Sequence, residues 1–238
     1  MNKNNLRIKI FSDGADVNEM EKASQAGIVK GFTTNPTLMK KSGITDYEKF
    51  AKEALAKVKN MPISFEVFSD DFETMEKEAM KIAGWGENVY VKIPITNTKR
   101  ESSINLIKAL DEKNVKLNVT AILTLQQVED LSKAFKDESK SIISVFAGRI
   151  ADTGVDPIPL MIEAKRILSV KPNLELLWAS SREVLNILQA EQCGCDIITV
   201  TPDLLKKLHM LGMDLGELSL DTVKMFFNDA SSAGYKIL

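Results

Sequence analysis

The chain has 238 residues, of which 44% are hydrophobic and 27% are charged, enough apolar content for one sizeable core. Its 31 basic and 33 acidic side chains leave a net charge of −2, which gives no electrostatic reason to expect nucleic acid or an anionic membrane as partner. No run of 18 apolar residues is present, and the apolar stretch after Met1–Asn5 is too short for a secretory signal, so we expect a cytoplasmic protein.

Short β-rich apolar runs alternate with helix-like spacing along the whole chain. The eight predicted strands are Leu6–Phe11, Gly27–Phe32, Pro62–Phe68, Asn88–Ile95, Val115–Val119, Ser141–Phe146, Leu174–Trp178 and Asp196–Val200. Helical spacing occurs at Tyr47–Leu55, Phe72–Ile82, Ile104–Leu110, Leu125–Phe135, Pro159–Leu168 and Leu204–Leu211, and a last helix is predicted at about 218–229.

Strands that are apolar throughout and alternate with helices are typical of a parallel sheet covered on both faces. Eight such units predict an α/β fold, a single (β/α)8 TIM barrel spanning residues 1–238 with an extra C-terminal helix. A doubly wound open sheet would usually carry a glycine-rich turn after its first strand. Here Ser12–Asp16 follows that strand, and the only G-x-G, Gly84–Gly86, precedes a strand.

Active sites of such barrels form at the carboxyl ends of the strands. Polar residues gather at or near these ends: Asp13, Thr33–Thr37, Glu66, Lys92, Asn118, Thr120, Ser144, Arg149, Ser180–Arg182, Thr199 and Thr201. We therefore expect the functional site to be built from this set.

Lys92 interrupts the otherwise apolar strand Val89–Ile95. Burying an ammonium group is costly, so such a lysine must pair with an acid or be held neutral. One interpretation is a side chain that reaches water from a frayed strand. The other is a Schiff-base lysine that attacks a carbonyl in a desolvated site.

Glu66 is likewise an acid inside an apolar strand. It could form a structural ion pair, with Lys92 as one candidate partner, or act as a general acid and base through a water. Asp13 alone could cap a helix, but Asp16, just before Val17, is the better N-cap and leaves Asp13 free.

The remaining polar segments have plain alternatives. Thr33–Thr37 could be only a turn, because Asn-Pro favours turn initiation. Arg149 and Arg182 could be surface arginines, or could bind a phosphate together with Ser180 at the mouth of the barrel.

The rare residues argue against metal and imidazole chemistry. The two cysteines, Cys193 and Cys195, match neither a redox C-x-x-C nor half of a zinc site, so we expect small buried thiols. The single histidine, His209, cannot supply a zinc centre of two or three histidines and lies in a predicted amphipathic helix.

Five segments, in this order and spacing, resemble the transaldolase family, most closely its short bacterial branch that also contains the fructose-6-phosphate aldolases. They are Thr33–Thr37, Val91–Pro94, Asn118–Ala121, Ser144–Ile150 and Trp178–Arg182. The resemblance implies a class I reaction of the pentose phosphate pathway without cofactor or metal. A ketose phosphate, such as sedoheptulose 7-phosphate or fructose 6-phosphate, would donate a dihydroxyacetone unit to an aldose phosphate.

The same resemblance implies a role for each matching residue. Lys92 would form the Schiff base, Asp13 would take the proton of the hydroxyl at the breaking bond, and Glu66 with Thr120 would hold a water that shuttles protons. The substrate-binding set would comprise Asn35, Asn118 and Ser144 for the hydroxyls, Arg149, Ser180 and Arg182 for the phosphate, and also Phe146.

Two positions distinguish the branches of the family. Transaldolases characteristically carry Glu and Phe where the aldolases have Gln and Tyr, and here these positions are Glu66 and Phe146, which favours transfer. Two residues depart from the family pattern, Ser181, where Phe is usual, and the bulky Trp178, and we expect them to affect the acceptor and phosphate end.

Two alternatives remain beside transfer: a fructose-6-phosphate aldolase that releases free dihydroxyacetone, and a non-catalytic barrel that binds sugar phosphates. The resemblance also implies a homo-oligomer, a pentamer or decamer, in which the C-terminal helix packs on its own barrel or on a neighbour's.

Overall fold

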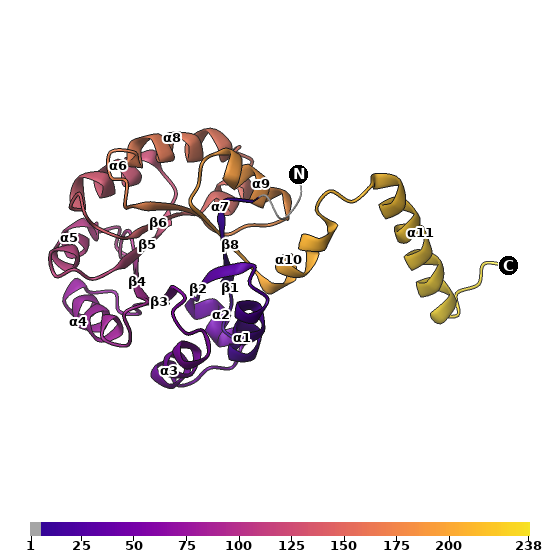
Figure 1. Cartoon of the computed structure of the whole chain (residues 1–238), viewed down its shortest axis with the longest axis horizontal. Helices are drawn as coiled ribbons and strands as arrows, with labels where there is room; N and C mark the ends of the chain where they lie inside the picture. Colours follow the sequence, from indigo (N-terminus) through magenta and orange to yellow (C-terminus); the bar gives the residue numbers. More distant parts are fainter. Residues whose placement is uncertain (1–5) are drawn as a thin grey trace. The chain divides into compact units, whose positions relative to one another are not determined.

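The computed structural model describes residues 6–238, and the chain forms two compact units. The larger unit, Arg7–Lys206, is a closed barrel of eight parallel strands in which neighbours follow chain order and β8 pairs with β1 (Figure 1). The strands are β1 (Lys9–Asp13), β2 (Val29–Thr33), β3 (Ile63–Glu66), β4 (Val89–Pro94), β5 (Leu117–Ile122), β6 (Ile142–Val145), β7 (Glu175–Trp178) and β8 (Ile197–Val200). The predicted (β/α)8 fold and all eight predicted strands are confirmed.

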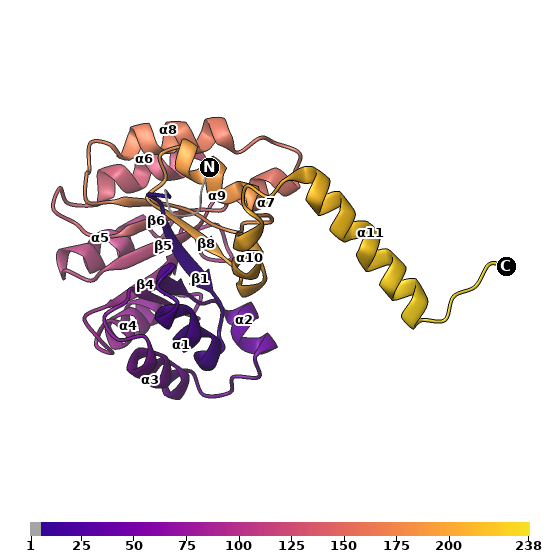
Figure 2. The ribbon, with the colours of Figure 1, turned by 45° about the vertical axis from the view of Figure 1, so that its right-hand side comes forward.

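Helices lie outside the strands of this unit (Figure 2). They are α1 (Val17–Gln25), α2 (Pro36–Lys41), α3 (Tyr47–Lys57), α4 (Phe72–Ala83), α5 (Ile104–Glu112), α6 (Leu125–Ala134), α7 (Ala147–Asp152), α8 (Ile158–Leu168), α9 (Leu185–Gln192) and α10 (Pro202–Lys206). The short helix α2 corrects the interpretation of Thr33–Thr37 as only a turn. Asn35 caps this helix and Pro36 begins it, a position where the missing N–H of proline costs nothing.

Short polar side chains decide where several helices begin. Asp16 accepts hydrogen bonds from the backbone N–H groups of Asn18 and Glu19, so the predicted N-cap is confirmed and Asp13 is not needed there. Asp46 caps α3 in the same way, and Thr124 forms a capping box with Gln127 at α6.

Strand β3 illustrates how the barrel separates core from site. Phe65 is fully buried and packs edge-on against Tyr47 and Phe50 of α3 and against Trp85. The alternate residues of a strand point to the opposite face, which here is the inside of the barrel. Ser64 and Glu66 therefore face inward, and the packing that holds the helices also orients the polar residues.

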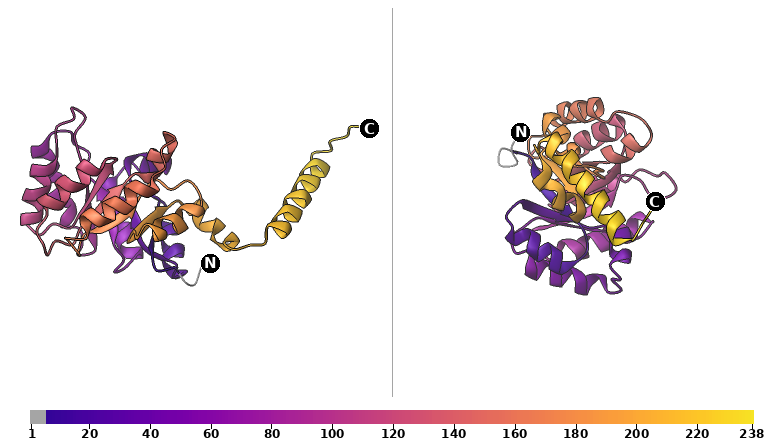
Figure 3. Two further views of the ribbon diagram at one scale, coloured as in Figure 1. Left: turned by 90° about the horizontal axis from the view of Figure 1, so that it is seen from above. Right: turned by 90° about the vertical axis from the view of Figure 1, so that its right-hand side faces the viewer.

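The second unit includes the C-terminal residues 207–238. It contains a 3-10 turn, η2 (Lys207–Met210), and helix α11 (Leu215–Ser232), drawn in yellow in Figure 3. The predicted C-terminal helix is confirmed and is three residues longer at each end. The predicted helix Leu204–Leu211 is instead divided between α10 and η2, which carries His209. A single domain for the whole chain, and its oligomeric state, stay predictions.

No helix of residues 6–238 is both long enough and apolar enough to cross a membrane. The expectation that the chain carries no secretory signal rests in part on Met1–Asn5. These residues lie outside the described part of the structure.

Both cysteines are buried free thiols, as expected. Burial raises the pKa of Cys193 to about 11 and also raises that of Cys195, because a thiolate loses its hydration there. We therefore expect the native protein to react slowly with an aromatic disulfide reagent at pH 8, and two thiols to react at once after unfolding. Rapid labelling of the native protein would contradict this.

Candidate active site

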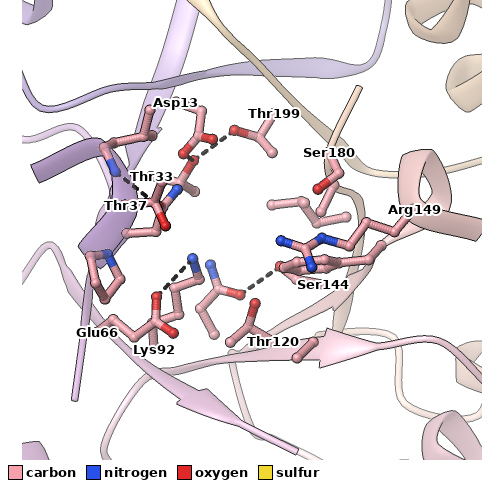
Figure 4. A pocket seen from close by; sticks show the side chains of 18 of the residues that line it. Asp13, Thr33, Thr37, Glu66, Lys92, Thr120, Ser144, Arg149, Ser180 and Thr199 are labelled. Carbon is pink, nitrogen blue, oxygen red and sulfur yellow. Dashed lines mark hydrogen bonds and ion pairs between the residues drawn. The ribbon is translucent and has the colours of Figure 1, made fainter. Parts of the chain in front are cut away.

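A cavity of about 430 Å³ opens at the carboxyl ends of the barrel strands (Figure 4). Of the eleven residues expected in the site, ten line it: Asp13, Asn35, Glu66, Lys92, Asn118, Thr120, Ser144, Phe146, Arg149 and Ser180. Arg182 is the exception. The structure thus brings together residues from all parts of the barrel chain that sequence patterns had marked separately.

Lys92 and Glu66 meet inside the cavity. Strand register places their Cα atoms opposite each other, and Lys92 Nζ lies 3.2 Å from Glu66 Oε2. Lys92 Nζ also donates to the backbone carbonyl of Thr34 at 3.1 Å. The two side chains are only 9% and 17% exposed, so Lys92 is not a side chain that reaches bulk water. An amine held beside a carboxylate, at the wall of a cavity, can attack a carbonyl and exchange protons with its neighbour.

Asn118 holds the next position around the barrel. It pairs in register with Lys92, donates through Nδ2 to Ser64 Oγ at 2.9 Å, and accepts through Oδ1 from Ser144 Oγ at 2.6 Å. The bonds on both sides fix the orientation of the amide. The chain of buried hydroxyl and amide groups therefore presents a rigid polar wall to a ligand.

Thr120 Oγ1 is buried and has no hydrogen-bond partner among the described residues. A buried hydroxyl of this kind calls for a water or a ligand atom. The next residue, Ala121, has φ 61°, and the pairing of β5 with β6 shifts register here. This irregularity lets both Thr120 and Ala121 line the cavity.

Asp13 is oriented by two threonines that line the cavity. Thr33 Oγ1 donates to Asp13 Oδ1 at 2.8 Å and lies 2.6 Å from the hydroxyl of Thr199. Burial raises the pKa of Asp13, an effect that the positive charge of Lys92 opposes. Asp13 is therefore an acid whose proton is held more firmly than usual, which suits a group that accepts and returns one.

Sequence patterns mark Thr33 and Thr199 only as strand-end residues and assign them no role. A polar residue at a strand end is the available signal. The contacts of Thr33 with Asp13 and with Thr199 depend on β1 lying between β2 and β8, as the closed barrel arranges it.

Asn35 has a structural task as well as a place at the cavity. Its Oδ1 accepts from the backbone N–H of Leu38 at 3.0 Å and so caps α2. The amide group is therefore the part of Asn35 that can donate to a ligand.

Arg149 and Ser180 lie on the side of the cavity away from Asp13 (Figure 4). The Arg149 guanidinium lies 5.4 Å from the centre of the Phe146 ring, which supports it from one face. Gly148 lets α7 approach the segment that follows strand β7 closely, because a Cβ there would lie 1.6 Å from the Ser180 carbonyl oxygen.

Arg182 lies outside the cavity lining. It forms an ion pair with Asp152, which raises its pKa, and donates to the carbonyl oxygen of Ser180 at 2.8 Å. Trp178 and Ser181 are also absent from the lining: Trp178 is 1% exposed, and Ser181 donates to the carbonyl oxygen of Thr199 at 2.8 Å. The two departures from the family pattern thus contact the scaffold around the site, and the role of Arg182 stays a prediction.

Within residues 6–238, no group of three or more His, Cys, Asp or Glu side chains is placed to hold a metal ion. The cluster that does form consists of one lysine, two acids, amides and hydroxyls.

Comparison with known proteins gives a consistent result. The family model described as transaldolase/fructose-6-phosphate aldolase matches residues 10–237. A "Probable transaldolase" of Brucella ovis is 35% identical over 97% of this chain and all of that protein. One of Methanococcus maripaludis is 35% identical over 84% of this chain and 89% of its own, and one of Nitrosopumilus maritimus is 32% identical over 84% and 87%.

Among solved structures, the crystal structure of dihydrodipicolinate synthase from Rhodopseudomonas palustris superposes with a TM-score of 0.55. It covers 93% of this chain and 80% of its own, at 13% sequence identity. This likeness supports the barrel fold alone.

Proposed function

The chain belongs to the transaldolase/fructose-6-phosphate aldolase family, and from this premise we propose that it is a transaldolase acting through an imine on Lys92. It transfers a dihydroxyacetone unit from a ketose phosphate to an aldose phosphate. The observation that carries the proposal is the Lys92 amine, 3.2 Å from the Glu66 carboxylate at the wall of the cavity.

Imine formation comes first. Lys92 passes a proton to Glu66, its amine attacks the ketose carbonyl carbon, and a proton moves to the oxygen to give a carbinolamine. Loss of that oxygen as water leaves the imine. Glu66 exchanges the protons through a water, and the partnerless hydroxyl of Thr120 is well placed to bind it.

Bond cleavage follows, with Asp13 as the base. Asp13 takes the proton of the hydroxyl on the carbon at the far end of the breaking C–C bond, and that carbon becomes the aldehyde of an aldose phosphate, which leaves. The electron pair of the broken bond passes into the imine, which becomes an enamine on Lys92. An incoming aldose phosphate then accepts this pair at its aldehyde carbon, Asp13 returns the proton, and water releases the new ketose phosphate.

The other residues of the cavity bind the substrate. Asn35, Asn118 and Ser144 bind the hydroxyl groups of the dihydroxyacetone unit. Arg149 and Ser180 receive the phosphate, where a guanidinium can bind two oxygens at once. Arg182 would join them if its side chain rotated away from Asp152, its ion-pair partner at the end of α7.

Glu66 and Phe146 favour transfer over release. Phe146 lines the cavity with a ring that carries no hydroxyl, so it cannot help to hold a water that would free the bound unit. A cytoplasmic enzyme of sugar-phosphate metabolism fits this proposal and the two free thiols.

A two-part assay tests the transfer. With fructose 6-phosphate and erythrose 4-phosphate, we expect sedoheptulose 7-phosphate and glyceraldehyde 3-phosphate as products. Without the acceptor, we expect little free dihydroxyacetone. Rapid release of dihydroxyacetone without an acceptor would instead favour the aldolase, and no reaction in either mixture, with no trapped imine, would favour a barrel that only binds.

A further inference from the structure

The side chain of Tyr47, on α3, contacts the backbone of Glu66. Tyr47 is the first residue of α3, and its hydroxyl accepts a hydrogen bond from the Glu66 backbone N–H at 2.7 Å and donates to the Glu66 carbonyl oxygen at 3.0 Å. One side chain thus satisfies both backbone groups of the residue whose carboxylate lies beside Lys92.

This contact occurs where the barrel has a gap in its hydrogen bonding. Strands β2 and β3 pair only at Phe32 with Ile63 and at Thr33 with Ser64, followed by one bond from Thr34 N–H to the Ser64 carbonyl. The chain then turns into α2, so β2 offers Glu66 no further partner. Buried backbone groups without partners are costly, and the Tyr47 hydroxyl takes the place of the missing strand.

The Tyr47 ring is itself held firmly. Its centre lies 4.6 Å from the ring of Phe68, 5.5 Å from that of Trp85 and 6.1 Å from that of Phe65. Burial raises the pKa of the Tyr47 hydroxyl, which therefore stays protonated and able both to donate and to accept.

Tyr47 is absent from the lining of the 430 Å³ cavity and lines a separate cavity of about 180 Å³. Glu66 is the one residue that the lining sets of these two cavities share. The hydroxyl therefore has a route to the reaction through Glu66 and no contact with substrate.

We propose that Tyr47 is a positioning residue, whose hydroxyl fixes the Glu66 backbone so that the carboxylate stays opposite Lys92 Nζ during imine formation. The inference rests on the proposed function, since it assigns Tyr47 to the proton transfers of Glu66. A shift of a reacting group by a fraction of an ångström is enough to slow such a step.

The test is Tyr47→Phe, which keeps the ring and its packing but removes the hydroxyl. We expect kcat for transfer to fall by about tenfold, with KM for fructose 6-phosphate unchanged. In a quenched time course with borohydride, imine should form on Lys92 more slowly but reach the wild-type yield. Tyr90→Phe is the matched control, because Tyr90 is a half-buried tyrosine two residues before Lys92 on β4, with no hydrogen bond to Glu66.

A second background separates positioning from a general effect on the fold. If Tyr47 acts through Glu66, Tyr47→Phe should have no further effect on imine formation in a Glu66→Gln enzyme. The rate is divided by the amount of folded protein, which is determined by circular dichroism. An equal loss in both backgrounds, or unchanged imine formation in Tyr47→Phe alone, would overturn the inference. Failure of the wild-type enzyme to trap at Lys92 would instead count against the proposed function.

Discussion

Lys92→Met is expected to abolish both imine trapping and sugar transfer. The side chain keeps its length and apolar stem but loses the amine, which is the nucleophile of the proposed reaction. We expect kcat to fall by on the order of 10⁴-fold or more, as for loss of a covalent nucleophile. Borohydride treatment with fructose 6-phosphate should add no mass to the variant, whereas the wild-type protein should carry the adduct on the peptide that contains Lys92.

The control for this experiment is another lysine in an ion pair. Lys165 lies 2.5 Å from Asp196 and outside the cavity lining, so Lys165→Met should keep trapping and turnover. Removing one partner of a largely buried pair can destabilise the fold, because the remaining Glu66 would be unpaired. The double variant Lys92→Met/Glu66→Gln removes both charges and keeps the test usable. A borohydride adduct on either folded variant would refute the assignment of Lys92.

The fold could be predicted because each strand carries its own signal. A strand such as β4 is apolar on both faces except at Lys92, and eight strands of this kind in alternation with helices leave few architectures. The predicted starts of helices depended on recognising N-cap residues. This worked for Asp16, whereas Asn35 was not recognised as a cap. There the same Asn-Pro pair suits a turn or a helix start, and only the contact with Leu38 decides between them.

The candidate site was predictable where a residue breaks the pattern around it. Lys92 and Glu66 are charged residues in apolar strands, and this contrast with their neighbours can be seen in the sequence alone. Tyr47 shows the limit: it begins an ordinary amphipathic helix, and nothing in its neighbours points to a strand-end residue 19 positions later. Arg182 shows the reverse case, since it matches the motif while its guanidinium pairs with Asp152.

Asp13→Asn should leave Lys92 able to form the imine but should stop cleavage of the C–C bond. Asparagine can still accept the hydrogen bond from Thr33, but it cannot take up a proton. Loss of a general acid or base typically costs about 10²- to 10⁴-fold in kcat. The trapped adduct of the variant with fructose 6-phosphate should therefore have the mass of the intact six-carbon sugar phosphate. An adduct of the three-carbon unit at the wild-type rate would contradict the role of Asp13.

The effect of pH follows from the buried carboxyl of Asp13. Because burial raises its folded-state pKa above the usual 3.8, the folded protein holds this proton more tightly than the unfolded chain. The stability that Asp13 contributes is full below pH 3.8 and is lost as the pH rises through the folded pKa, whereas cleavage activity should rise over the same range.

At neutral pH, Asp13→Asn should thus unfold at an equal or higher temperature while being inactive. Asp16→Asn is the matched control, since this N-cap lies on the surface three residues away and asparagine caps equally well. A buried carboxylate that lowers stability but is needed for turnover is what distinguishes a catalytic Asp13 from a structural one, for which Asp13→Asn should lower stability and spare the reaction.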